Sequence, residues 1–236
     1  DMRLMLSVWS KIDPNSAVGK EAQDKNYFIP GTTWIDFFDK DATDFYWENF
    51  SARLLKPYQI DAWWQDATEP ENDDLVGRKV NNQTIPGEVY RNAYPLLVSK
   101  TVYEGCRNDD PERRSMIFTR SAFPGIQRYG SVFWSGDVGN DWETLRRQIS
   151  GGFGMQAAGV PWWTYDAGGF FRPGNQYKDK AYIERLLRWV QISVYLPLMR
   201  VHGYQSNTEP WCYGGEAKSI IAKSLEERYR LLPYIY

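Results

Sequence analysis

Apolar runs of strand length alternate along the chain with stretches in which apolar residues recur at the helical period. The runs that predict buried strands are residues 4–9, 58–65, 116–119, 132–134, 159–165 and 196–201. The stretches that predict helices are residues 41–55, 90–107, 141–151, 180–195 and 216–232. Because strands alternate with helices or long loops, the pattern favours parallel βα units joined by right-handed crossovers.

Two connecting segments have the composition of loops. Residues 10–45 are rich in proline, glycine, aspartate and aromatic residues, and we expect a long loop there that covers a strand end. Asp41 is the expected N-cap of the helix that follows. Residues 68–84 are acidic and too hydrophilic for a core, so a solvated loop is expected there as well.

Polar residues follow the predicted strands at the same end. Asp66, Arg120, Asp137, Asp166 and His202 each lie at or just past the carboxyl end of a predicted strand. Eight-stranded βα barrels build their sites on this face, and a complete barrel needs eight βα units in roughly 250 residues. Since only six units are recognisable, the sequence predicts an α/β fold that is a partial (β/α)8 TIM barrel, roughly its third to eighth βα units. We expect residues 1–236 to be one incomplete catalytic barrel domain of a larger protein.

Composition narrows the expected partners and chemistry. The formal net charge is -2 with acidic and basic residues interspersed, so neither nucleic acid nor a membrane surface is expected as a partner. No apolar run approaches the roughly 20 residues that cross a bilayer. Cys106 and Cys212 lie far apart and His202 is the single histidine, so no metal or cofactor is expected. Aromatic residues make up 16% of the chain, which suits sugar rings, although many tryptophans can simply be core.

Asp66 and Asp137 are the candidate catalytic pair. A glycosidic bond is hydrolysed by one carboxylic acid and one carboxylate on either side of the anomeric carbon, about 5–5.5 Å apart in retaining enzymes. Asp66 ends an aromatic run and Asp137 follows a Trp-Ser-Gly sequence. For Asp66 alone, an aspartate that caps the turn after a strand is an equally good interpretation. Asp141 is better explained as a helix N-cap. The acidic run 71–74 is better explained as a solvated loop.

A second set of residues is suited to substrate binding. Its members are Trp64, Arg120, Trp134, Asp166, Phe170 and His202. The Arg120 guanidinium suits forked hydrogen bonds to sugar hydroxyls or to the nucleophile, and equally a salt bridge to an acid at the barrel rim. Asp166 is suited to accept a hydrogen bond from a sugar hydroxyl, and it is also explained by turn chemistry, since Asp before Gly-Gly is common in turns. A lone histidine is more often structural than catalytic, and His202 is also explained as the end of a strand.

Five motifs that occur in one order resemble glycoside hydrolase family 31, which contains retaining α-glucosidases and α-xylosidases. They are Trp-Trp-Gln-Asp-Ala-Thr-Glu-Pro at 63–70, Phe-Thr-Arg-Ser-Ala-Phe-Pro-Gly-Ile-Gln-Arg-Tyr at 118–129, Trp-Ser-Gly-Asp at 134–137, Tyr-Asp-Ala-Gly-Gly-Phe at 165–170 and Met-Arg-Val-His-Gly at 199–203. The resemblance covers nearly the whole chain and implies Asp66 as nucleophile and Asp137 as acid/base. It further implies polar sugar contacts from Arg120, Asp166 and His202, and an aromatic wall made of Trp64, Trp134 and Phe170.

The chain departs from the family pattern at two places. We expect the first two barrel strands to be missing from these residues, and the nucleophile motif reads Asp-Ala-Thr-Glu where many α-glucosidases have Asp-Met-Asn-Glu. This form of the nucleophile motif, together with the sequences of residues 7–13 and 29–38, resembles bacterial α-xylosidases. The resemblance therefore implies a retaining, exo-acting α-glycosidase that releases xylose from xyloglucan oligosaccharides by double displacement. An α-glucosidase of the same family is the alternative, and a non-catalytic carbohydrate-binding remnant is the alternative of another class. The resemblance to this family also implies a periplasmic or secreted protein.

Overall fold

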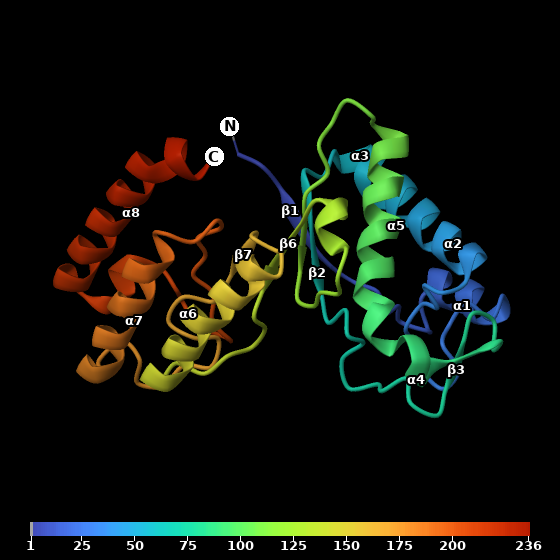
Figure 1. The fold of residues 1–236 in the computed structure, drawn as a ribbon, viewed down its shortest axis with the longest axis horizontal. Coiled ribbons are helices and arrows are strands. Elements are labelled where there is room, and N and C mark those ends of the chain that lie inside the picture. The colour runs from blue at the N-terminus through green and yellow to red at the C-terminus, as the bar shows by residue number, and fades with distance from the viewer. Residues whose placement is uncertain (1) are drawn as a thin grey trace. The chain divides into compact units, whose positions relative to one another are not determined.

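The structure, a computed structural model, describes residues 2–236 and divides into two compact units. The first unit ends at Val132 and the second is Phe133–Tyr236. The boundary falls inside strand β6 (Ser131–Trp134), which is labelled with the other elements in Figure 1.

Three parallel strands form the sheet of the first unit. β1 (Met5–Trp9) pairs with β2 (Ala62–Asp66), and β2 pairs with β5 (Ile117–Thr119). The register sets Trp9 beside Asp66 and Gln65 beside Thr119. Because the strands are parallel, the residues at their carboxyl ends meet at one edge of this sheet.

Helices α2 (Lys40–Phe50) and α5 (Tyr94–Asp109) lie beside each other and cover one face of this sheet (Figure 1). Large rings fill the space beneath them, and Tyr46, Trp63 and Tyr94 are each at most 1% exposed. Full burial of a large apolar side chain contributes about 1.5–3 kcal/mol. This aromatic core therefore holds β2 firmly against its helices.

Shorter elements complete the first unit. They are α1 (Ala17–Asp24), a π-helical turn (Ser51–Leu55), α3 (Lys56–Tyr58), the hairpin of β3 (Lys79–Val80) and β4 (Ile85–Pro86), α4 (Gly87–Tyr90) and two 3₁₀ turns (Arg91–Ala93 and Ile126–Tyr129).

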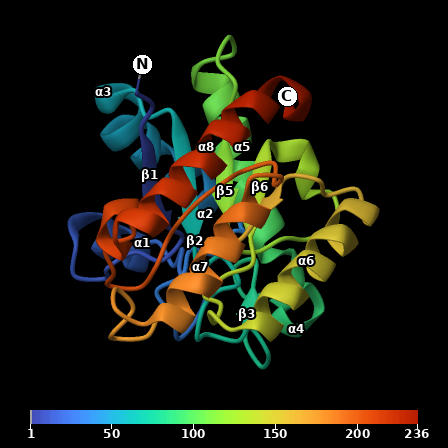
Figure 2. The same cartoon turned by 90° about the vertical axis from the view of Figure 1, so that its left-hand side faces the viewer.

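The second unit pairs β6 with β7 (Trp163–Thr164) in parallel. Its helices are α6 (Trp142–Ala157), α7 (Lys180–Ser193) and α8 (Gly215–Ile235), with a 3₁₀ turn at Pro210–Tyr213. Figure 2 shows α7 and α8 side by side, and they pack against each other. Helix α6 packs so close to β7 that a Cβ at Gly152 would come 2.6 Å from the Trp163 ring, and glycine allows this approach.

Most predicted elements form, with several corrections in the first unit. Residues 10–45 are not one long loop, because α1 forms within them, capped by Ser16, whose hydroxyl accepts from Gly19 N at 2.9 Å. The N-cap of α2 is Asp39 and not Asp41, since the Asp39 carboxylate accepts from Asp41 N at 2.8 Å. Strand β1 forms as predicted, but it is the outer strand of this sheet and only Val8 of its residues is buried.

The acidic segment 68–84 also contributes to the core, contrary to expectation. Thr68, Leu75 and Val80 are each at most 1% exposed, and the β3–β4 hairpin begins within the segment. Three inward-facing side chains are enough to anchor a segment whose other residues are polar.

Two predicted strands of the second unit differ from expectation. The strand predicted at 159–165 shortens to β7, preceded by Gly159 with φ +77° and by Pro161, which has no N–H for a ladder. No strand forms at 196–201. Arg228 of α8 instead donates to the carbonyls of Val194, Leu196 and Pro197, so these three carbonyls bind a guanidinium and not the N–H groups of a neighbouring strand.

None of the helices within residues 2–236 is long and apolar enough to span a membrane.

Candidate active site

Asp66 is the last residue of β2 and faces away from the helices that cover the sheet. Ser99 of α5 donates to Gln65 at 3.3 Å, and Trp63 Nε1 lies 3.2 Å from Cys106 Sγ on the same helix. Because side chains alternate along a strand, Trp64 and Asp66 point to the opposite face. The Asp66 side chain is 23% exposed there, and Trp64 is half-buried beside it.

Arg120, which directly follows β5, binds three carboxylates. Its side chain is 9% exposed, and its nitrogens lie 3.4 Å from Asp66, 2.7 Å from Glu69 and 3.1 Å from Glu71. Its backbone N–H donates to Gln65 O at 3.2 Å, which fixes the base of the side chain to β2. Arg120 thus holds the candidate nucleophile and two acids of the following loop at once.

The pKa of Asp66 is set by opposing effects. Burial raises it, while the Arg120 guanidinium and the Ala67 N–H, which donates to Asp66 Oδ1 at 2.8 Å, lower it. The neighbouring carboxylates of Glu71 and Glu69 raise it, and the net pKa lies above the ordinary value. Arg120 is therefore the main group that favours the ionised form of Asp66.

The acidic run 71–74 is not a plain solvated loop, which corrects the expectation from the sequence. Glu71 binds Arg120, and Asp73 accepts from Trp34 Nε1 at 2.8 Å. Behind them, the Thr68 hydroxyl lies 3.0 Å from that of Thr119, and both side chains are fully buried. The loop after Asp66 is therefore anchored by hydrogen bonds at several points.

Trp9 is a candidate site residue that the sequence analysis treated only as part of a strand. It lies in register with Asp66, its side chain is 41% exposed, and its ring stacks on Trp34 at 5.9 Å with an interplanar angle of 12°. Trp34 is fully buried. A rigidly backed, exposed ring next to a carboxylate has the properties of a sugar platform. The signal in the sequence was its position as the last residue of a strand.

Asp137 lies in the second unit, on a loop three residues after β6, and it is exposed. The loop is tied to the segment that follows β7, since Phe170 N and Phe171 N both donate to Val138 O, at 2.9 and 3.1 Å. Asn140 Nδ2 donates to Phe171 O at 2.8 Å. The position of Asp137 therefore depends on this second segment.

Close approach of the two segments requires glycine. Gly169 has φ +80°, and a Cβ there would lie 2.6 Å from Gly139 O. Its N–H donates to Asp166 O at 2.8 Å, which closes the turn. The glycine turn expected after Asp166 is present, and it serves to seat the loop of Asp137.

Asp166 is fully buried and forms an ion pair with Arg200 at 2.6 Å. Burial and, to a lesser extent, the nearby Asp137 carboxylate raise the pKa of Asp166, the Arg200 guanidinium lowers it, and the net pKa is about 7. The Arg200 guanidinium also lies 5.2 Å from the centroid of the Trp134 ring. Trp134 is 3% exposed, so most of its surface is buried. Arg200 was not a candidate from sequence because it lay inside a predicted strand.

His202 stacks on the Phe170 ring at 5.6 Å, and both residues are half-buried. Burial, together with the cations Arg200 and Arg172, lowers the pKa of His202 to about 4. Arg172 donates to His202 O at 3.0 Å and to Ala167 O at 2.8 Å. His202 is therefore a neutral imidazole near pH 7, held by a clamp that joins its segment to the Asp166 turn.

The structure thus assigns the candidate residues to two groups. Trp64, Asp66 and Arg120 gather at the end of β2 in the first unit. Trp134, Asp137, Asp166, Phe170 and His202 lie in segments of the second unit that contact one another or a shared arginine. Among residues 2–236, no group of three His, Cys, Asp or Glu side chains could hold a metal ion.

Parallel βα units that present carboxylates, arginines and exposed rings beyond their strand ends have the arrangement on which βα barrels build their sites. The model of the glycosyl hydrolases family 31 TIM-barrel domain matches residues 1–236, and the chain belongs to this family. The expected α/β fold, part of a TIM barrel, is confirmed.

Relatives of this chain include α-xylosidases and α-glucosidases. An α-xylosidase of Saccharolobus solfataricus is 41% identical, over 99% of this chain and 32% of its own length. Human neutral α-glucosidase C is 28% identical, over 96% of this chain and 26% of its own length. The crystal structure of a GH31 α-xylosidase from a soil metagenome, complexed with xylose, matches with a TM-score of 0.88 and 30% identity, over 99% of this chain and 39% of that one. The chain thus spans about a third of the length of these relatives.

Proposed function

We propose that this chain is the main part of one catalytic barrel domain of a retaining, exo-acting α-glycosidase. We further propose that the enzyme releases α-linked xylose from xyloglucan oligosaccharides. The observation that carries this proposal is the Asp66–Arg120 ion pair at the end of β2, backed by Glu69 and Glu71. Family membership and the relatives named as α-xylosidases support the choice of substrate.

In the proposed mechanism, the Asp66 carboxylate attacks the anomeric carbon while Asp137 donates its proton to the departing glycosidic oxygen. The bond from the anomeric carbon to that oxygen breaks, and a glycosyl ester with Asp66 forms. Asp137, now a carboxylate, takes a proton from water, whose oxygen attacks the same carbon and releases Asp66. Two inversions at one carbon retain the α configuration.

The remaining candidates bind the sugar in this proposal. Trp64 and Trp9 offer apolar surface on the side of Asp66, and Phe170 offers it in the second unit. Asp166 and His202 exchange hydrogen bonds with sugar hydroxyls, and Trp134, which lies against the Arg200 guanidinium, adds to the aromatic wall. The Arg120 guanidinium acts chiefly on Asp66.

A mechanism-based fluorinated α-xyloside tests the nucleophile in the intact enzyme. We expect the label on Asp66, and a label on any other residue would overturn the assignment. For Asp137→Ala we expect loss of activity that azide restores on an activated aryl α-xyloside. Asp141→Ala is the matched control, because Asp141 caps α6 by accepting from Thr144 N at 2.8 Å. This control should lose stability without gaining a response to azide.

An α-glucosidase is the second candidate function, favoured by the similarity to human neutral α-glucosidase C and to a solved dextranase of Flavobacterium johnsoniae complexed with glucose. Xylose lacks the hydroxymethyl group of glucose, and such a difference is worth only about 1–3 kcal/mol in a pocket. Comparing kcat/KM for matched aryl α-xylosides and α-glucosides separates the two. Retention of xyloglucan oligosaccharides without hydrolysis would instead indicate a non-catalytic binding protein.

A further inference from the structure

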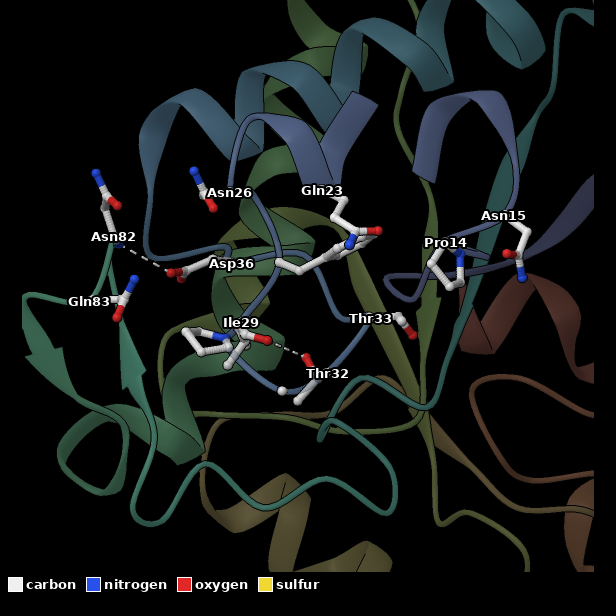
Figure 3. Close-up of a pocket in the computed structure, with 13 residues that line it drawn as sticks. Pro14, Asn15, Gln23, Asn26, Ile29, Thr32, Thr33, Asp36, Asn82 and Gln83 are labelled. Carbon is white, nitrogen blue, oxygen red and sulfur yellow. Dashed lines mark hydrogen bonds between the residues drawn. The ribbon is translucent and has the colours of Figure 1, made fainter. Parts of the chain in front are cut away.

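A pocket of about 580 Å³ lies in the first unit, apart from the residues proposed for catalysis (Figure 3). It is formed by residues 14–15, by α1, by the loop at 26–36 and by the turn at 82–83. These segments follow the carboxyl ends of β1 and β2 along the chain. The volume falls within the range of about 300–1,000 Å³ that is usual for small-molecule sites.

Amide and hydroxyl groups dominate the lining. The polar lining residues other than Asp36 are Asn15, Gln23, Asn26, Thr32, Thr33, Asn82 and Gln83. Within residues 2–236, the amide groups of Gln23, Asn26, Asn82 and Gln83 make no hydrogen bond to the protein. Each of these amides can donate and accept hydrogen bonds. The pocket therefore presents four amides that are available to a ligand.

The ionisable groups at the pocket are already bound to the backbone. Asp36 is 3% exposed, and its carboxylate accepts from Phe38 N at 3.1 Å and from Asn82 N at 3.3 Å. Arg78 approaches behind Gly31 and donates to Pro30 O at 2.6 Å. A ligand that carried a net charge would find no free counter-ion in this lining, so the chemistry favours a neutral ligand.

Apolar groups complete the lining. Figure 3 shows Asn26, Asn82 and Gln83 at the Asp36 end, and Pro14 with Asn15 at the other. Phe28, Ile29 and Pro30 contribute apolar surface to the lining. Hydroxyl-binding amides together with small apolar surfaces match the edges and faces of a sugar ring.

The pocket and Asp66 are linked through two stacked rings. Trp34, which directly follows the lining residue Thr33, is fully buried and stacks on Trp9. Trp9 lies in register with Asp66. Since these residues all lie beyond the carboxyl ends of β1 and β2, the pocket and the proposed nucleophile share one edge of the sheet of the first unit.

We propose that this pocket binds a neutral glycosyl unit of the oligosaccharide substrate, separate from the unit that Asp66 cleaves. This inference rests on the proposed function for the identity of the oligosaccharide. The pocket acts by lowering the Kd of long substrates, and it contributes nothing to the chemical step.

The test uses the intact protein with Asp66→Asn, which prevents turnover, and a xyloglucan oligosaccharide as the probe. The pocket variant adds Gln23→Ala and Asn82→Gly. Gln23 is exposed on α1, and Asn82 has φ +51°, so glycine removes the amide without backbone strain. Calorimetric titration should give a Kd at least about tenfold higher than that of the Asp66→Asn parent.

The matched control adds Asn108→Ala and Gln59→Gly to the same parent. Asn108 is an exposed residue of α5, and Gln59 is exposed with φ +50° before the amino end of β2. The control should bind like the parent. Equal binding by the pocket variant and the parent would overturn the proposal, and so would equal weakening in the control.

Failure of the proposed function gives a different result. In that case the unmodified enzyme hydrolyses neither α-xylosides nor α-glucosides, whatever the pocket variant binds. If the pocket alone has been misassigned, hydrolysis persists and the titration shows no effect of Gln23→Ala with Asn82→Gly.

Discussion

Replacement of Arg120 by alanine should impair the proposed nucleophile by removing its cation. Two unit charges 3.4 Å apart attract by about 5 kcal/mol at an effective dielectric constant of about 20. Breaking a buried ion pair typically costs about 3–5 kcal/mol. Because the Asp66 side chain is still 23% exposed, solvent screens part of this energy, and we expect about 2–3 kcal/mol. That energy corresponds to a fall in kcat/KM of roughly 30- to 150-fold.

The pH dependence of Arg120→Ala identifies the cause of that loss. Burial and the carboxylates of Glu71 and Glu69 raise the pKa of Asp66, while Arg120 and the Ala67 N–H lower it. Without the guanidinium, the pKa of Asp66 rises further. A nucleophile must be ionised, so the acid limb of the kcat/KM profile should move to higher pH and the loss should be greatest in acid.

The assay is hydrolysis of an aryl α-xyloside by the intact enzyme from about pH 4 to about pH 8. Arg113→Ala is the matched control, since Arg113 pairs with Asp61 before the amino end of β2. This variant loses an ion pair of the same type and should keep the acid limb of the parent. An acid limb that stays in place in Arg120→Ala, or that moves equally in both variants, would refute the reasoning.

Three further predictions concern Asp166, Gly169 and Trp9. Burial raises the pKa of Asp166 to about 7, so its contribution to stability is complete below the ordinary pKa of 3.8 and is lost as pH rises through about 7. Asp166→Asn should remove that slope, as calorimetric unfolding across this pH range measures. Gly169→Ala places a Cβ 2.6 Å from a backbone oxygen of the loop that carries Asp137, so Tm and kcat should both fall, kcat by about tenfold or more. Trp9→Ala should raise KM for an aryl α-xyloside by about tenfold, whereas Trp162→Ala, which removes another exposed ring, should leave it unchanged.

Periodicity and capping were enough to predict the longer helices. Helix α6 begins after Asp141 as expected, because an aspartate directly before a run of helical period is a strong start signal. Helix α1 was missed because its 8 residues are too few to show a period and only Gly19 and Ala22 of them are buried. At α2, several aspartates precede the apolar residues, and only the backbone geometry selects Asp39 as the cap.

A sequence can reveal which residues lie at the end of a strand, but it does not reveal which distant residue a side chain will contact in the fold. Asp66 is the last residue of its strand and Arg120 directly follows its own, and the rule for parallel sheets placed them at one edge. The partner of Asp166 could not be predicted, because Arg200 lies 34 residues further along in a segment that reads as a strand. Arg228 binds the carbonyls of Leu196 and Pro197 at the start of that segment, and such a contact between distant residues leaves no local pattern.

The acidic loop after Asp66 determines the net charge around that residue, which its composition alone did not indicate. Arg120 brings one positive charge to Asp66, Glu69 and Glu71, so the cluster carries a net charge of about -2 when all three acids are ionised. A single carboxylate with one guanidinium would be electrically neutral. Glycosidic cleavage passes through a transition state that resembles an oxocarbenium ion, in which positive charge develops on the sugar. Negative charge that is fixed before the reaction stabilises that state more than the neutral substrate. In the proposed mechanism, Arg120 therefore favours the ionised form of Asp66, while Glu69 and Glu71 keep the guanidinium from cancelling the negative field that the proposed reaction requires.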